Sequence, residues 1–81
     1  MKMPITMEWV VVTNGKEVRL KEDNTFSLVH RHYKLFPLNV AIEVKKTQDS
    51  ETIGFAEIKE LTWKNDTTTI IYELKKLKGV N

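Results

Sequence analysis

The sequence predicts an all-β fold, a small antiparallel β-barrel, closed or partly open, of about six strands. Three observations lead to this prediction. Short apolar runs alternate with polar residues at a period of two, turn-forming residues separate these runs, and 81 residues leave room for one domain, residues 1–81. Strands that each carry one apolar face must curl around a shared interior, and a small barrel does this with little chain.

The first two strands are expected on either side of Asn14-Gly15. A type I′ turn needs positive φ at both central residues, which Asn and Gly tolerate, so runs 10–12 and 18–20 should form a hairpin. In the segment before the turn, alternate residues are all apolar. These are Ile5, Met7, Trp9 and Val11.

Three further strands are predicted in the second half: residues 40–44, 52–63 and 67–74. Within 52–63 the apolar residues change parity twice, which indicates a β-bulge near Ala56–Glu57 and a second irregularity near Glu60. The residues from Lys75 onward are expected to fray. The full set of expected interior residues is Ile5, Met7, Trp9, Val11, Val18, Leu20, Val40, Ile42, Val44, Phe55, Ile58, Ile70, Tyr72 and Leu74.

Residues 25–36 fit two kinds of element. As a strand, the segment loses its alternation at His30–His32. As a helix that begins after Asn24, it places four apolar residues on one side: Phe26, Val29, Tyr33 and Phe36. We favour a bent or bulged strand, with room for one short helical turn, which Pro37 ends.

Composition excludes several classes of protein. The chain has no cysteine, which removes disulfide frameworks, thiolate metal sites and cysteine nucleophiles. No apolar run is long enough for a signal peptide or a membrane span. There is no Gly-rich phosphate loop, nucleophile elbow or paired-carboxylate motif. We therefore expect a cytoplasmic protein that is not an enzyme, with no cofactor and no membrane partner.

The densest group of functional residue types is His30, Arg31, His32, Tyr33 and Lys34. Arg31 and Lys34 can meet phosphates while Tyr33 or a histidine stacks on a base, so the group is a candidate RNA contact. A net charge of only +2 weighs against this interpretation. Two histidines on one strand face could also ligate a metal with Glu43 or Glu57, but ordinary surface histidines explain the pair better, and no metal site is predicted.

A second candidate surface is a protein interface formed by Trp9, Val10, Val12 and Trp63. Tryptophan is enriched at interfaces, and Val10 and Val12 lie on the second face of the first strand. The ordinary alternative is that each tryptophan anchors the core or its rim. If the interface forms, the chain is a homo-oligomer or binds a protein partner.

Three stretches carry a family resemblance. They are Met3-Pro4-Ile5-Thr6-Met7-Glu8-Trp9, Phe36-Pro37-Leu38-Asn39-Val40-Ala41-Ile42-Glu43-Val44 and Ile53-Gly54-Phe55-Ala56-Glu57-Ile58. Together they resemble the YtmB-type family of small uncharacterised proteins from Bacillus and relatives. The resemblance implies a compact β-barrel and no assigned function. Residues 53–61 also resemble a strand of the PUA-like barrels, which are RNA-associated domains, and this likeness implies RNA binding.

Overall fold

The computed structural model describes residues 5–21 and 23–77. All regular secondary structure in these residues is β-strand, which confirms the all-β prediction. The strands are β1 (Thr6–Met7), β2 (Val10–Val12), β3 (Val18–Lys21), β4 (Thr25–Arg31), β5 (Lys34–Leu35), β6 (Ala41–Lys45), β7 (Thr52–Lys64) and β8 (Thr67–Leu77). The described part of the chain holds no helix that is long and apolar enough to span a bilayer. The short helical turn considered for residues 25–36 is absent.

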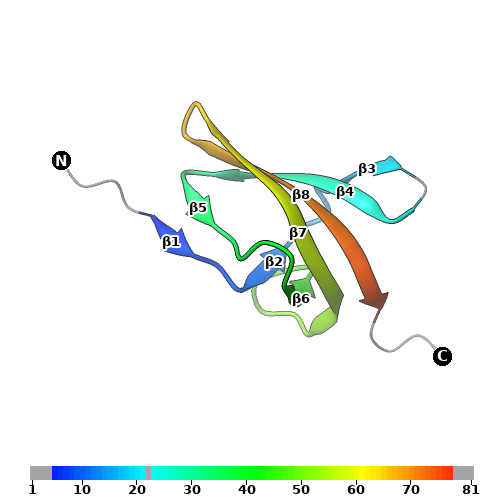
Figure 1. Ribbon diagram of the computed structural model, residues 1–81. Helices are drawn as coiled ribbons and strands as arrows, with labels where there is room; N and C mark the ends of the chain where they lie inside the picture. The colour runs from blue at the N-terminus through cyan, green and yellow to red at the C-terminus, as the bar shows by residue number, and fades with distance from the viewer. Residues whose placement is uncertain (1–4, 22, 78–81) are drawn as a thin grey trace.

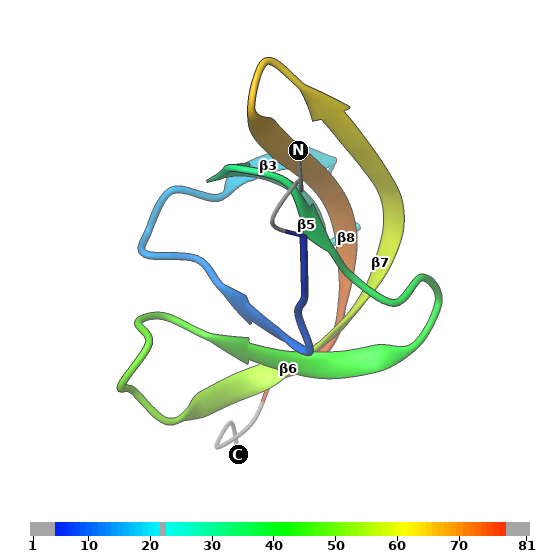
Figure 2. The same cartoon turned by 90° about the vertical axis from the view of Figure 1, so that its left-hand side faces the viewer.

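Six strands form one mixed sheet in the order β2-β6-β7-β8-β4-β3, and β1 pairs separately with β5. The long strands β7 and β8 run through the centre of the molecule (Figure 1). Seen from the side, the sheet curves, and β1, β2 and β5 lie inside the curve (Figure 2). The curvature lets one sheet bury its own concave face.

The predicted barrel, closed or partly open, is not confirmed, because β2 and β3 are the two edges of the sheet and do not pair with each other. The prediction of purely antiparallel pairing is wrong. Both β1–β5 and β2–β6 are parallel, and the remaining four pairings are antiparallel. The strands do wrap around an apolar interior, as predicted, but through an open sheet.

The Asn14-Gly15 turn forms, but the hairpin predicted around it does not. Asn14 and Gly15 have φ of 52° and 73°, and Lys16 N–H donates to the carbonyl oxygen of Thr13 at 2.9 Å, as a type I′ turn requires. The strands then diverge to opposite edges of the sheet, where β2 joins β6 and β3 joins β4.

Burial explains why β2 leaves its expected partner. Val11 is fully buried and lies beside Val44 of β6 in parallel register. Val18 and Leu20 of β3 are instead largely exposed, so β3 offers no apolar face for β2 to pack with. Turn chemistry specified the local reversal of the chain, whereas the apolar core determined the partner of each strand.

The core lies on the concave face of the sheet. It consists of Val11, Leu28, Phe36, Ile42, Val44, Ala56, Ile58, Ile70 and Tyr72, with Phe26, Leu61 and Leu74 packed against it. Six of these buried residues were predicted: Val11, Ile42, Val44, Ile58, Ile70 and Tyr72. The prediction was wrong for six exposed residues: Ile5, Met7, Trp9, Val18, Leu20 and Val40. Those residues lie on edge strands or connections that the core does not cover.

The irregularities of the long strands follow the prediction only in part. The β7–β8 register shifts between Ile58 and Glu60, where the extra residue lies in β7, which confirms the predicted irregularity near Glu60. The register also shifts between Phe55 and Ala56, but there the extra residue, Lys75, lies in β8. The bulge predicted in 52–63 near Ala56–Glu57 is therefore wrong, because β7 keeps one buried parity through Gly54, Ala56 and Ile58. Segment 25–36 is a bent strand, with β4 and β5 separated by a break at residues 32–33. β8 stays paired as far as Leu77, beyond the point where fraying was expected, and residues 78–81 lie outside the described part.

Candidate functional site

The chain bends between β4 and β5 because His32 adopts a left-handed conformation. Its φ is 68°, and its backbone N–H donates to the carbonyl oxygen of Asp66 at 2.7 Å. Asp66 lies in the turn between β7 and β8, where Asn65 and Asp66 also have positive φ. The segment predicted to contact RNA is therefore fixed by its backbone to the tip of the β7–β8 hairpin.

The hydroxyl of Thr68 stabilises this bend from inside. It accepts a hydrogen bond from Lys34 N–H at 2.8 Å and donates one to the carbonyl oxygen of His32 at 2.8 Å. Thr68 is fully buried. One hydroxyl thus satisfies two backbone groups that the bend removes from the sheet, which is the role expected of a buried polar side chain.

Tyr33 and Trp63 hold the same bend from outside. Their ring centroids are 5.2 Å apart. The hydroxyl oxygen of Tyr33 accepts a hydrogen bond from Asp66 N–H at 3.1 Å, and Trp63 Nε1–H donates to the carbonyl oxygen of Lys34 at 2.8 Å. These contacts fix the orientation of both rings, while Trp63 keeps 37% of its surface exposed.

His30 and His32 do not come together as a metal-binding pair. The His30 ring packs on Phe36, with centroids 5.4 Å apart, whereas His32 is exposed and its Nδ1 lies 3.2 Å from Asp66 Oδ2. Burial, assisted by the nearby Lys34 ammonium, lowers the pKa of His30 from 6.5 to about 4. Residues 5–21 and 23–77 contain no cluster of three His, Asp or Glu side chains that could hold a metal.

Two accessible basic residues, Arg31 and Lys64, lie close together on the convex face. Arg31 of β4 lies opposite Thr67 of β8, and Thr67 lies opposite Lys64 of β7. Arg31 and Lys64 are exposed. Of the five residues predicted to contact RNA, the structure leaves Arg31 and His32 on this surface.

Farther along the same face, acidic and basic side chains alternate. Glu57 and Glu73 lie directly opposite each other, and Lys59 Nζ is 2.8 Å from Glu57 Oε1 and 3.9 Å from Glu73 Oε1. Lys75 Nζ is 2.8 Å from Glu73 Oε1. The Lys59 hydrogen bond lowers the pKa of Glu57, and the Glu73 hydrogen bond raises the pKa of Lys75. The lysines offset the repulsion between the two carboxylates, so this region is not a basic patch.

An exposed apolar surface lies at the start of the chain. We call Ile5, Met7, Trp9 and Leu35 the N-terminal apolar face; their exposed fractions are 41%, 46%, 57% and 41%. Met7 of β1 lies beside Leu35 of β5 in parallel register, and Glu8 N–H donates to the Leu35 carbonyl oxygen at 2.7 Å. The four side chains that define this face are all apolar.

The structure separates the four residues predicted to form an interface. Trp9 belongs to the N-terminal apolar face, and Trp63 supports the β4–β5 bend. Val10 and Val12 are half-buried and line a small cavity. Trp9 and Trp63 are 57% and 37% exposed, so both keep accessible surface, and the interface stays a prediction.

That cavity, which we call the polar cavity, has a volume of about 160 Å³. It is lined by Glu8, Val10, Val12, Asn14, His30, Lys34 and Gln48. Its residues come from β2, β4, β5 and three connecting segments. A larger share of polar than of apolar residues in so small a space makes it a candidate binding site.

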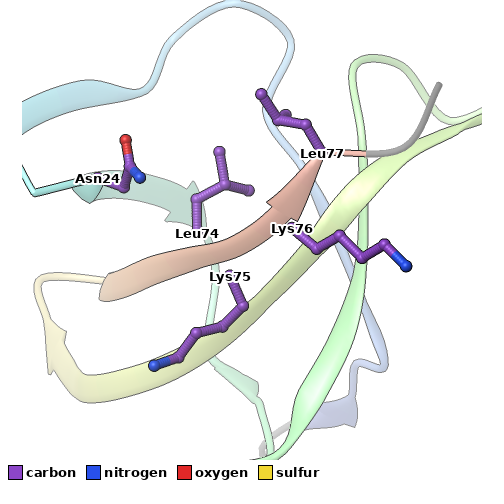
Figure 3. A pocket seen from close by; sticks show the side chains of 5 residues that line it. All are labelled: Asn24, Leu74, Lys75, Lys76 and Leu77. Carbon is purple, nitrogen blue, oxygen red and sulfur yellow. The ribbon is translucent and has the colours of Figure 1, made fainter. Parts of the chain in front are cut away.

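A second cavity of about 330 Å³ lies at the end of β8 and is lined by Asn24, Leu74, Lys75, Lys76 and Leu77. In Figure 3 the side chains of Leu74 and Leu77 extend on one side of the strand, whereas the ammonium groups of Lys75 and Lys76 point away from them. No polar groups converge there, so this cavity has no evident chemistry.

The fold and these surfaces define a small all-β domain, and the chain belongs to DUF2584, a family described as a domain of unknown function, whose model matches residues 1–81. It is similar to the uncharacterized protein YtmB of Bacillus subtilis (strain 168), with 40% identity over 81 residues, which is 100% of each chain. The crystal structure of YtmB from Bacillus subtilis matches with a TM-score of 0.92 and 40% identity, over 100% of this chain and 99% of that chain.

These comparisons confirm the resemblance to the YtmB-type family and its lack of an assigned function. The descriptions of the family and of YtmB name no ligand, so RNA binding and the likeness to PUA-like barrels stay predictions. Sequence reasoning missed Glu8, Asn14 and Gln48 as cavity residues. Nothing in their spacing could have identified them, because they reach the polar cavity from three separate connections.

Proposed function

We propose that this chain is a non-catalytic, cytoplasmic interaction module that binds a second copy of itself through the N-terminal apolar face. The observation that supports the proposal is the exposure of Ile5, Met7, Trp9 and Leu35 at neighbouring positions. Covering an apolar surface that is exposed to water lowers the free energy of the system, and exposed apolar surfaces are typical of interaction sites.

Two features favour a second copy as the partner. The four side chains that define the face are apolar, so it is complementary to another apolar face, and a twofold axis brings two copies of the same face together without any further component. In addition, β1 pairs only with β5 among the described strands, so its other edge has backbone groups free to pair with β1 of another molecule.

Sedimentation analysis over a range of protein concentrations tests this proposal. The unmodified chain should sediment as a dimer, and Met7→Glu and Trp9→Ser should sediment as monomers because each removes apolar contact area. Val29→Lys is the matched control, since Val29 is 57% exposed but lies on β4, away from the face. A chain that stays monomeric at every concentration would refute the proposal.

RNA binding is a second candidate, and the row of Arg31 and Lys64 beside His32 favours it. Fluorescence anisotropy with labelled single-stranded and structured RNA should then show binding that weakens as salt rises, because phosphate contacts release counterions. Arg31→Glu and Lys64→Glu should each weaken binding, whereas Lys46→Glu, an exposed change in the β6–β7 loop, should not. Absence of binding at low salt would exclude this function.

A further inference from the structure

The polar cavity combines opposite charges with neutral polar groups at close quarters. Glu8 and Lys34 both line it and are both half-buried, yet no ion pair joins them within residues 5–21 and 23–77. Asn14 and Gln48 add two side-chain amides, and Val10 and Val12 add apolar surface. Two opposite charges that border one cavity without pairing are a feature that the fold itself does not require.

His30 contributes a further unsatisfied group. Its Nε2 is buried and has no hydrogen-bond partner among the described residues. With a pKa of about 4, the ring is neutral at pH 7. The lining of the polar cavity then carries one negative charge, one positive charge and a neutral imidazole, with no net charge.

The cavity is held in place mainly by backbone hydrogen bonds, so its lining is arranged before any ligand arrives. Glu8 N–H donates to the Leu35 carbonyl oxygen at 2.7 Å, Asn14 N–H to the Lys46 carbonyl oxygen at 2.7 Å, and Lys34 N–H to the buried Thr68 hydroxyl at 2.8 Å. A site that needs little ordering on binding loses little free energy to that ordering.

We propose that the polar cavity binds a small zwitterion of the size and charge of an α-amino acid. A ligand with one charge would satisfy either Glu8 or Lys34 and leave the other half-buried charge without a partner, which is costly. A zwitterion can place its ammonium toward Glu8 and its carboxylate toward Lys34.

The volume sets the size of the ligand. About 160 Å³ corresponds to roughly five water molecules, and it lies below the range of roughly 300–1,000 Å³ typical of sites for drug-sized ligands. Val10 and Val12 would contact a short apolar side chain. The residues that line the cavity differ from those of the N-terminal apolar face and from Arg31 and Lys64, so the inference is independent of the proposed self-association and RNA binding.

Titration followed by ¹H–¹⁵N NMR tests the inference, with alanine as the zwitterion and acetate and methylammonium as the single-charge probes. Alanine should shift the amide signals of Glu8, Asn14 and Lys34 in a saturable way. Acetate and methylammonium should bind at least about tenfold more weakly, a difference of about 1.4 kcal/mol.

Charge-removing variants test whether Glu8 binds the ammonium of the ligand and Lys34 binds its carboxylate. Glu8→Gln and Lys34→Gln should each weaken alanine binding by about tenfold or more, whereas the convex-face controls Glu60→Gln and Lys64→Gln should leave it unchanged. The titrations of the unmodified chain test the inference by themselves, so the inference remains testable even if a variant does not fold. The inference is overturned if alanine gives no saturable shift, if acetate binds as tightly as alanine, or if a folded Glu8→Gln or Lys34→Gln variant keeps full affinity.

Discussion

At His30, burial and a neighbouring charge act in the same direction. The ring packs against Phe36, and the Lys34 ammonium lies near enough to disfavour a second positive charge, so the pKa falls to about 4. Glu8 is the acidic group that shares the polar cavity with His30. A histidine that the sequence suggested as a surface contact therefore behaves as a neutral polar residue at the edge of the core.

Lowering the pH from 7 to 4.5 should destabilise the protein through His30. The unfolded chain takes up a proton near pH 6.5 and the folded chain only near pH 4, so the free energy of unfolding falls as pH decreases through this window. We expect a loss on the order of 2 kcal/mol, after allowance for partial exposure. Urea unfolding at a series of pH values measures it.

His30→Gln should remove most of this pH dependence, and His32→Gln, a change at an exposed histidine, should keep it. Glu57 contributes in a different window, because its pKa is lowered from 4.5 and its effect is lost only at more acidic pH. A His30→Gln variant with an unchanged pH profile between 6.5 and 4.5 would contradict the prediction.

Gly54 and Gly15 should respond differently to substitution by alanine. A Cβ at Gly54 would collide with the carbonyl oxygen of Lys76 in the adjacent strand, so Gly54→Ala should cost about 2–3 kcal/mol by forcing β7 and β8 apart. A Cβ at Gly15 meets nothing within 4 Å, and only its φ of 73° opposes alanine, for a cost of about 1 kcal/mol. Thermal unfolding of both variants checks the order, and a Gly54→Ala variant as stable as Gly15→Ala would contradict it.

At the scale of the elements, the β4–β5 bend depends on Thr68. Thr68→Val keeps the volume and the β-branched form of the side chain but leaves Lys34 N–H and the His32 carbonyl oxygen without their partner. Because both groups lie in a partly buried region, we expect a loss of about 2–4 kcal/mol.

Chemical denaturation measures that loss, and hydrogen exchange at the Lys34 amide should become faster in Thr68→Val. Thr69→Val is the matched control, because Thr69 is the next residue of β8 and points to the opposite face of the sheet. If both variants were equally stable, the Thr68 hydroxyl would not be what holds the bend.

Local sequence signals predicted the elements well where each signal acts within the element itself. The parity change near Glu60 located the irregularity of β7, and the lost alternation at His30–His32 located the bend that follows β4. The parity change near Ala56 did not locate one, because the extra residue at that point lies in β8. The Asn14-Gly15 signal described its turn correctly but not the pairing, because β2 gains more by burying Val11 against β6. Partner choice depends on the whole core, which no short segment encodes.

The candidate sites were harder to predict than the strands. Trp9 was named as an interface residue and is exposed, whereas Trp63 and Tyr33 are used by the bend through contacts between residues about thirty positions apart. The polar cavity could not be predicted, since Glu8, His30 and Gln48 meet only after the sheet has curved. Alternation tells which residues share a face but not which faces meet.

For the whole molecule, the topology requires contacts between distant segments. β2 pairs with β6, and β4 pairs with β8, so only β6–β7, β7–β8 and β3–β4 join strands that are neighbours in sequence. Folds dominated by distant pairings fold slowly, typically in milliseconds to seconds. We expect the β7–β8 hairpin to form before β2 docks.

Stopped-flow fluorescence of Trp63 can test this order through two core variants. Ile70→Val, in the hairpin, should slow folding, whereas Val11→Ala, in β2, should mainly speed unfolding and give a φ-value near zero. Both side chains are fully buried, so both variants should lose enough stability for the ratio to be measured. A high φ-value at Val11 would reverse the proposed order.

The parallel pairing of β2 with β6 also has a consequence for synthesis of the protein in the cell. Residues 5–12 are synthesised before β6, and the strand that lies beside Val11 is made more than thirty residues later. Throughout that interval this apolar stretch of the nascent chain lacks its partner strand. Cellular factors that recognise uncovered apolar segments would therefore meet residues 5–12 before the sheet has formed and buried Val11.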